Sequence, residues 1–423
     1  MKKRLLPILL LGGVLLVEKA SAQFTLSGEV TPRTELRNGF KKPIAEGQDV
    51  ALFTEQRSRI NFGYASPNYE LKISLQDVRI WGAVAQIYKA DPSLSNVFEA
   101  YGKYKFGSSS ISVGRMALDY DRARFLGNLG WAMQARSHDL ALYQYKSDSS
   151  GVTLDVGVAF NQDAKTPEYG KLVSNYYSGV ANYKSMQYVW FNKKIKSGNF
   201  SLLAHNNTTQ IIVPADSSNL DTTSVTNMQT LGGFISTKAS ESVSIIGEAY
   251  YQTNFMTGGD VSAFFISAEA AFKVGKATLT VGGEYMSGED GTGTSFSAFN
   301  PLYGTNHKFN GYMDYFYVGN GHGNVGLINP YLKVKLKTGE KSTLMADVHG
   351  FMSAVELASG SYLGTELDLV FVSKLADGVT FKIGQSVLGA TESMMGLKAV
   401  PVASGKSLNT WSWAQIIFTP KFL

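Results

Sequence analysis

The chain consists of runs of about ten residues in which apolar and polar side chains alternate, joined in turn by tight turns and long loops. In the run from Phe24 to Asn38, apolar residues fall on one face and charged residues on the other. Such a period of two is typical of β-strands. About 18 such runs without a long apolar helix are typical of a closed barrel in an outer membrane. We therefore expect an all-β fold, a transmembrane antiparallel β-barrel of about 18 strands.

The alternation also gives approximate bounds for each element. Strands are predicted near residues 24–38, 51–65, 69–82, 96–106, 109–121, 137–147, 150–161, 183–196, 199–210, 225–239, 242–255, 260–273, 276–288, 324–337, 341–354, 362–374, 378–388 and 408–421. Long loops are predicted near residues 39–50, 83–95, 122–136, 162–182, 211–224, 289–323 and 389–406, and a short one at 256–259. In this class the short turns are periplasmic and the long loops extracellular, and an even strand count places both termini on one side.

The first 22 residues have the pattern of a secretory signal peptide. A basic start is followed by an apolar stretch too short to span a bilayer and by an A-x-A site ending at Ala22. We predict a signal peptide over residues 1–22, a barrel over residues 23–423, and location in the outer membrane of a Gram-negative cell. Cleavage would remove four basic side chains and one acidic one from a chain of net charge +5, which leaves +2. This balance gives no reason to expect nucleic-acid binding.

Several segments resemble one known family. Gln76–Gly82 resembles the Q-D-V-R-x-W-G segment of the alginate export family of outer-membrane porins. Further similar segments are Gly114-Arg115, Tyr120–Arg122, Arg124–Gly127, Trp131, Arg136–Asp139 and Leu302–Asp314. The resemblance implies an 18-stranded monomeric barrel with an arginine-lined conduit. The chain departs from the family pattern at Asp121 and at His138, which replaces a common Phe.

Arginines concentrate in the first third of the mature chain. The candidates for pore lining and selectivity are Arg33, Arg37, Arg57, Arg59, Arg79, Arg115, Arg122, Arg124 and Arg136. If they project into the lumen, they form one basic wall that concentrates anions. The alternative is that carboxylates of the same strands pair with them and hold the barrel's shape. Asp77 with Arg79, and Asp139 with Arg136, are predicted lumenal ion pairs of this structural kind.

The longest predicted loop, residues 289–323, is rich in aromatic side chains. Long loops in compact proteins are often functional. The loop is interpreted either as a gate folded into the mouth or as a cap over the outside. Its gate candidates are Tyr303, His307, Lys308, Phe309 and Asp314.

Enzyme and metal signatures are weak in this sequence. Ser137, His138 and Asp139 are consecutive, so along a strand they cannot form a catalytic triad among themselves. The chain has no cysteine, and its five histidines lack metal-ligand spacing. We therefore predict no enzyme activity and no cofactor.

The predicted function is passive diffusion of hydrophilic solutes, with anions as the favoured class, through an arginine-lined lumen. The expected partners are outer-membrane lipid and small anionic or hydrophilic solutes, and not nucleic acid. Two alternatives stay open, an exporter of an anionic, alginate-like polysaccharide and a plugged barrel that acts as a surface anchor. The alternation decides neither between an open and a plugged lumen nor between a monomer and a trimer.

Overall fold

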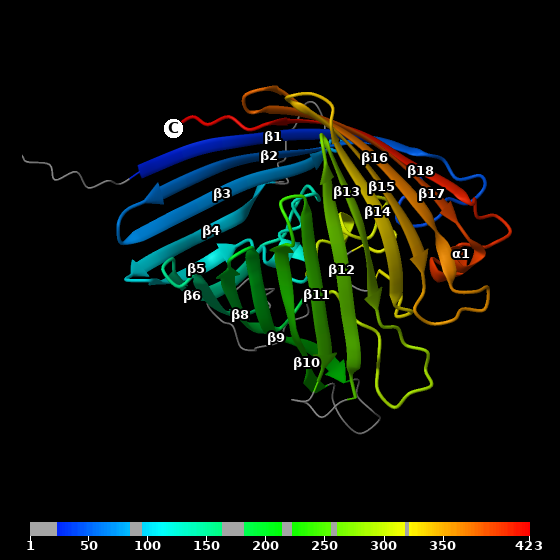
Figure 1. The fold of residues 1–423 in the computed structure, drawn as a ribbon, viewed down its shortest axis with the longest axis horizontal. Coiled ribbons are helices and arrows are strands. Elements are labelled where there is room, and N and C mark those ends of the chain that lie inside the picture. Colours follow the sequence, from blue (N-terminus) through cyan, green and yellow to red (C-terminus); the bar gives the residue numbers. More distant parts are fainter. Residues whose placement is uncertain (1–22, 85–94, 163–181, 214–221, 255–259, 318–320) are drawn as a thin grey trace, which may run out of the picture.

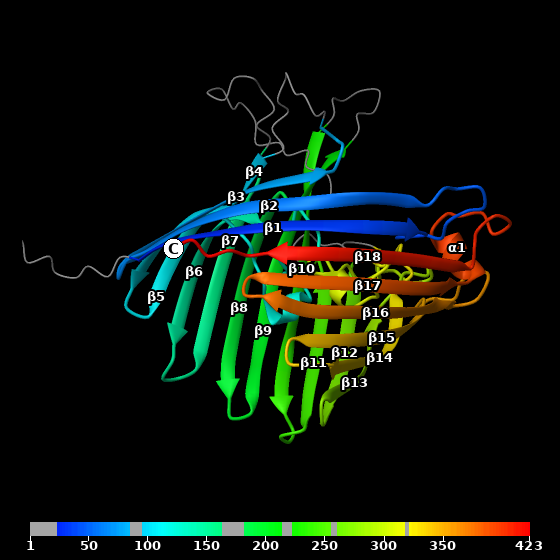
Figure 2. The same cartoon turned by 90° about the horizontal axis from the view of Figure 1, so that it is seen from above.

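The computed structural model describes residues 23–84, 95–162, 182–213, 222–254, 260–317 and 321–423. Within these ranges eighteen strands form one antiparallel sheet, which closes where β1 pairs with β18 (Figures 1 and 2). The strands are β1 (Gln23–Asn38), β2 (Ala51–Ala65), β3 (Tyr69–Ile80), β4 (Ser95–Phe106), β5 (Ser109–Met116), β6 (His138–Ser147), β7 (Val152–Phe160), β8 (Ser185–Ile195), β9 (Gly198–Val213), β10 (Thr222–Lys238), β11 (Val243–Thr253), β12 (Ser262–Val274), β13 (Ala277–Met286), β14 (Leu327–Lys337), β15 (Ser342–Met352), β16 (Tyr362–Ala376), β17 (Val379–Ala390) and β18 (Leu408–Phe418). One short α-helix, α1 (Glu392–Leu397), and the 3-10 turns η1 (Asp121–Ala123) and η2 (Asn306–Lys308) lie in loops.

The predicted fold class and strand count are confirmed, and two predicted boundaries are wrong. The strand expected over residues 109–121 ends at Met116, because the chain there turns into the lumen. The loop expected over residues 211–224 is shorter, because β9 continues to Val213 and β10 begins at Thr222. The predicted signal peptide at residues 1–22 and the whole short connection at 256–259 lie outside the described residues, as do parts of other loops.

Alternate side chains on each strand face opposite sides of the wall. The outward positions carry apolar residues such as Leu52, Leu202 and Ile266, whose exposed fractions are 71%, 56% and 53%. A continuous outward apolar surface on a closed barrel is what a lipid environment requires. In the described parts of the chain, no helix is long and apolar enough to cross a membrane.

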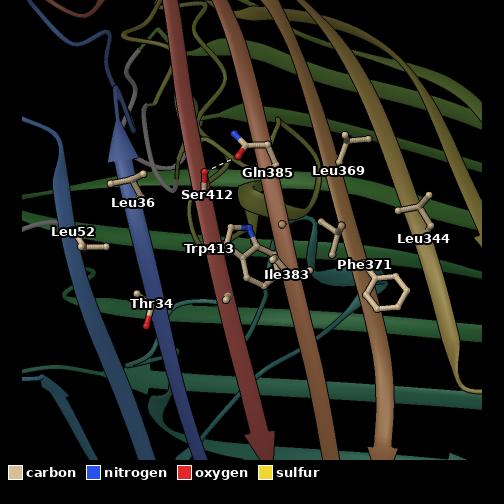
Figure 3. Close-up of a pocket in the computed structure, with 13 residues that line it drawn as sticks. Thr34, Leu36, Leu52, Leu344, Leu369, Phe371, Ile383, Gln385, Ser412 and Trp413 are labelled. Carbon is tan, nitrogen blue, oxygen red and sulfur yellow. Dashed lines mark hydrogen bonds between the residues drawn. The ribbon is translucent and has the colours of Figure 1, made fainter.

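A shallow groove of about 410 Å³ lies on this outer surface (Figure 3). Its walls include the outward-facing Leu36, Leu344 and Leu369. At its centre Ser412 donates a hydrogen bond to Gln385 at 2.6 Å, so both polar side chains are satisfied on the lipid side. The groove is therefore part of the lipid-facing surface and does not belong to a passage through the barrel.

The buried core of this protein lies inside the barrel. The β5–β6 loop (residues 117–137) folds into the lumen (Figure 1). So do residues 298–317 of the β13–β14 loop, which connects Met286 to Leu327. Their apolar side chains pack against lumenal side chains of the strands. Fully buried members of this cluster include Leu126, Met313, Phe316 and Trp411. The lumen is thus packed like a protein interior over part of its width.

The chain after β18 completes the seam of the barrel. Gly28 donates its backbone N–H to the Pro420 carbonyl at 3.0 Å, and Phe422 donates to the Leu26 carbonyl at 2.8 Å. The ladder between β1 and β18 is therefore prolonged by irregular hydrogen bonds beyond Phe418, where Pro420 ends regular pairing.

Large lumenal aromatic rings lie across glycines of the neighbouring strand. Directly opposed pairs of this kind are Gly157 with Tyr188, Gly282 with Tyr331, and Gly384 with Trp413. A methyl group added to Gly157 would come within 2.1 Å of the Tyr188 ring. The missing side chain is what allows the ring to lie flat against the sheet.

We predict that Gly157→Ala lowers the free energy of unfolding by about 1–3 kcal/mol, because the Tyr188 ring must leave its packed position. Urea unfolding of the refolded barrel, followed by tryptophan fluorescence, measures this. The control is Gly389→Ala, whose added methyl would lie 3.9 Å from its nearest neighbour, the Thr365 carbonyl oxygen. Equal losses in both variants would show that the ring contact is not the cause.

Candidate functional site

The β5–β6 loop crosses the lumen and is tied to the wall formed by β1 and β2. Arg33 of β1 donates to the Trp131 carbonyl at 2.9 Å, and its guanidinium lies 4.1 Å from the centre of the Trp131 ring. Arg57 of β2 donates to three further carbonyls of the loop. These belong to Gly130, Ala132 and Met133, at 3.2–3.3 Å. Two arginines thus satisfy the carbonyls of a loop that has no strand beside it.

The positive charges of this anchor are balanced by carboxylates of β1. Glu35 accepts from Arg33 at 2.7 Å and from Arg37 at 2.8 Å. Glu29 accepts from Arg57 at 2.6 Å. Because the N–H groups of Arg33 and Arg57 bond to carboxylates and to loop carbonyls, few of their donors are left for a solute.

A second anchor holds the same loop to the opposite wall. Arg124 donates to Glu248 of β11 at 2.7 Å and forms an ion pair with Glu284 of β13 at 2.8 Å. Burial alone would lower the pKa of Arg124, but the carboxylates of Glu284 and Glu248 outweigh burial and raise it. Arg122 pairs with Glu269 of β12 at 2.9 Å. The loop is therefore a strap, fixed on one side of the barrel by hydrogen bonds from arginines to its carbonyls and on the other side by ion pairs.

The β13–β14 loop lies against this strap. Gly127 donates its backbone N–H to the Tyr303 carbonyl at 3.0 Å, and Thr305 donates to the Ala123 carbonyl at 2.9 Å. The Phe309 ring lies 3.5 Å from the guanidinium of Arg124. Backbone hydrogen bonds and a cation–π contact therefore join the two loops inside the lumen.

Further contacts fix the β13–β14 loop from its other side. Asp314 and His307 of the loop lie 2.7 Å apart, and Met313 donates its backbone N–H to Glu366 of β16 at 2.8 Å. The Tyr315 hydroxyl donates to the Gly39 carbonyl of the β1–β2 loop at 2.7 Å. Residues 301–317 of the segment predicted as a gate or a cap thus lie inside the barrel, whereas residues 290–294 are exposed. The gate role remains a prediction.

Two of the arginines predicted to line the lumen face outward. Arg79 lies on the outward face of β3, because Gln76 of the same strand reaches the strap by donating to the Gln134 carbonyl. Its partner Asp77, at 2.6 Å, is outward for the same reason. The prediction of a lumenal Asp77–Arg79 pair is wrong, although the pair exists. Both residues lie near the outer end of β3, where polar head groups replace hydrocarbon.

The second predicted lumenal pair is also wrong. Asp139 bonds to Arg115 at 2.8 Å on the outward face, whereas the prediction paired Asp139 with Arg136. Arg136 instead donates to the carbonyls of Gly127 and Tyr303 and so joins the two inner loops. Burial lowers the pKa of Arg136. Sequence spacing alone could not show that the loop before Asp139 turns inward and carries Arg136 away.

No catalytic or metal-binding arrangement forms among these residues. His138 faces the lumen and bonds to the Tyr183 hydroxyl at 2.9 Å, while Asp139 faces outward. In the described ranges no three histidine or acidic side chains cluster as metal ligands would.

Two cavities lie on either side of the joined loops. The outer cavity, about 590 Å³, is lined by Leu129, Tyr303, Arg136 and Tyr317 of the two loops. Arg115 and Asp139 also border it, from the ends of β5 and β6, although their strand positions alternate outward. Burial, followed by the negative charge of Asp314, raises the pKa of Tyr317 to about 12. The neighbouring residues Gly130 and Thr305 line the inner cavity, so only the thickness of the two loops separates the cavities.

The inner cavity, about 340 Å³, lies toward the ends of β16 and β17 that are joined by a short turn. Its lining includes Asp119, Trp131, His307, Lys308, Tyr312 and Lys382. Burial and then the charge of Arg122 lower the pKa of Lys308, and burial raises the pKa of Asp119 despite the nearby Lys308. Lys382 was not among the predicted pore-lining residues. Lys382 and Gly384 are two residues apart on β17 and so face the same side, which could have placed Lys382 in the lumen.

The fold is similar to that of several solved outer-membrane barrels. OccAB4 of Acinetobacter baumannii matches with 11% identity and a TM-score of 0.63 over 95% of this chain and 98% of that chain. OpdQ of Pseudomonas aeruginosa matches with 11% identity and a TM-score of 0.58 over the same shares. The outer membrane protein opdK of P. aeruginosa matches with 8% identity and a TM-score of 0.56 over 94% of this chain and 99% of that chain. OpdK has also been solved with vanillate. No family model and no curated protein matches the sequence.

These comparisons contradict the resemblance to the alginate export family. The solved structures that match this chain over nearly its whole length are Opd and Occ proteins instead. The segments that suggested the alginate export family form local contacts in this barrel. Arg124 anchors the strap and Asp77 pairs with Arg79. The charged residues of these segments thus make contacts within this barrel, and the segments did not identify the family.

We predict that Arg124→Met lowers the free energy of unfolding by about 3–5 kcal/mol, because the buried carboxylates of Glu248 and Glu284 lose their partner. Urea unfolding of the refolded barrel measures the change. The control Lys374→Met breaks an exposed ion pair with Asp377 and should cost less than about 1 kcal/mol. A loss for Arg124→Met as small as that of the control would argue that the anchor does not hold the strap.

Proposed function

We propose that this barrel is a passive channel for small hydrophilic solutes and that it favours anions. The observation that carries the proposal is the pair of cavities separated only by the two inner loops. A barrel of eighteen strands is wide enough to leave an aqueous channel unless loops fill it. Here the loops reduce the lumen to small-molecule dimensions without removing polar and cationic groups from either cavity.

The dimensions of the cavities argue for small solutes over polymers. An exporter of an anionic polysaccharide would need a wide and continuous track of available arginines. In this barrel Arg33, Arg57 and Arg124 hold the strap and are paired with carboxylates. The exporter alternative also loses the family resemblance on which it depended, and it is not retained.

The similar structures give separate support for a small organic solute. OpdK, whose fold matches over 94% of this chain, has been solved with vanillate, a small aromatic carboxylate. Because the identity to OpdK is 8%, the likeness concerns the fold, and the anion preference of this chain depends on its own lumenal cations.

We predict steady open steps with an anion-biased reversal potential when the refolded mature protein is inserted into a planar bilayer under a potassium chloride gradient. The physical reason is that lumenal cations in a narrow pore raise the local anion concentration. A cation-biased reversal potential would contradict the anion preference. A correctly folded barrel that never conducts would contradict the channel itself.

We also predict that replacing residues 304–313 by a short Gly-Ser linker increases the single-channel conductance severalfold. This segment of the β13–β14 loop contains η2 and occupies the centre of the lumen, so its removal widens the path. Retention of heat-modifiable migration in gel electrophoresis serves as the folding control. An unchanged conductance in a folded variant would show that the segment lies beside the path.

A further inference from the structure

We infer that the anion contact of this channel is made by Lys382 and Lys308 in the inner cavity, and not by the arginine wall. The inference depends on the proposed function, because it names the groups through which the channel would select. Both lysines line the same cavity of about 340 Å³, a volume within the usual range of small-molecule sites.

The arginines near the strap are excluded as the anion contact, because most of their N–H groups already bond to other groups of the protein. Arg33, Arg57 and Arg124 each bond to a carboxylate and lie against the strap or within it. Arg59 makes no ion pair among the described residues and donates only its Nε–H, to Gln76. Its Nη2 is buried without a partner, but Arg59 lies 3.7 Å from the Phe98 ring centre and lines neither cavity, so its position excludes it. A guanidinium whose N–H groups are already bonded has little left to offer a passing anion.

The outer cavity carries two arginines, but these are also engaged. Arg115 is paired with Asp139 at 2.8 Å. Arg136 donates to the carbonyls of Gly127 and Tyr303, which join the two inner loops. The outer cavity therefore has positive charge but few available donors.

Lys382 differs from these arginines in its surroundings. It lies on the lumenal face of β17, and the residues directly opposite are the uncharged Val372 of β16 and Gln415 of β18. Among the described residues it forms no salt bridge and no hydrogen bond through its side chain. A lysine ammonium carries three donors on a flexible stem, so Lys382 can follow a solute over a short distance.

Lys308 approaches the same cavity from the β13–β14 loop. Its ammonium donates to the Arg122 carbonyl at 3.0 Å, which leaves two of its three N–H groups available. Burial is the main cause that lowers the pKa of Lys308, followed by the charge of Arg122, so its ammonium is poorly solvated in the cavity. An anion that enters would offset both effects.

The remaining wall strengthens the attraction. The rings of Trp131 and His307 stack at 4.3 Å, and those of His307 and Tyr312 at 5.1 Å. Aromatic surfaces exclude water and lower the local dielectric constant, which increases the interaction of an ammonium with an anion. Asp119, the acidic group that lines the cavity, accepts a hydrogen bond from Asn128 at 2.9 Å. The ligand class that fits is a small solute with one carboxylate or a similar anionic group.

The test compares Lys382→Met, Lys308→Met and the double variant with the wild type in planar bilayers. We expect the anion-to-cation permeability ratio to fall in each single variant and most in the double variant. We also expect block of the chloride current by acetate to become about tenfold weaker, as the loss of a hydrogen bond to a charged group implies. Lys382→Arg should keep the permeability ratio near that of the wild type.

The matched control is Lys335→Met, a lysine of β14 that does not line the cavity. It should change acetate block by less than twofold. If Lys382→Met fails to insert, Lys382→Gln is measured instead. A wild type without anion preference would contradict the proposed function. A wild type that prefers anions, together with lysine variants that keep this preference and the acetate block, would overturn the lysine assignment alone.

Discussion

The lumen of this barrel is organised by guanidinium groups that bond to a loop crossing it. A wide barrel does not by itself hold a chain segment at its centre, because such a segment has no neighbouring strand to satisfy its backbone. Arg33 and Arg57 supply donors to the loop from one wall, and Arg124 joins the loop to carboxylates of the opposite wall. The second inner loop then pairs with the first, and the two cavities are what remains on either side.

The barrel itself could be predicted well from the sequence, because a period of two in hydrophobicity is imposed by lipid on one side and water or polar packing on the other. The strand count followed from the same constraint. The interior was harder to predict. Alternation predicts which side of the wall each strand residue faces. It does not predict that the loop after Met116 turns inward, so that Arg122, Arg124 and Arg136 lie in the lumen.

The errors in the predicted site have a common physical origin. Charged residues were assigned to the lumen because lipid disfavours charge, yet Arg79 and Arg115 face outward near the outer ends of their strands. At that level the surroundings are polar, so the rule that holds in the hydrocarbon layer does not apply. Lys382 was missed because it is the one charged residue of β17, and a single lysine does not stand out beside a group of arginines.

The irregular pairing after β18 has a consequence for how the barrel can form. The backbone of Leu26 and Gly28 near the start of β1 is hydrogen-bonded by Pro420, Phe422 and Leu423, beyond the last regular strand. In hydrocarbon an unpaired N–H or carbonyl is costly, so β1 is complete only when these residues are in place. A polypeptide tag fused directly after Leu423 would compete for this seam, whereas one placed in a long outer loop would leave it intact. Residues 420–423 therefore help to close the barrel through their backbone hydrogen bonds to β1.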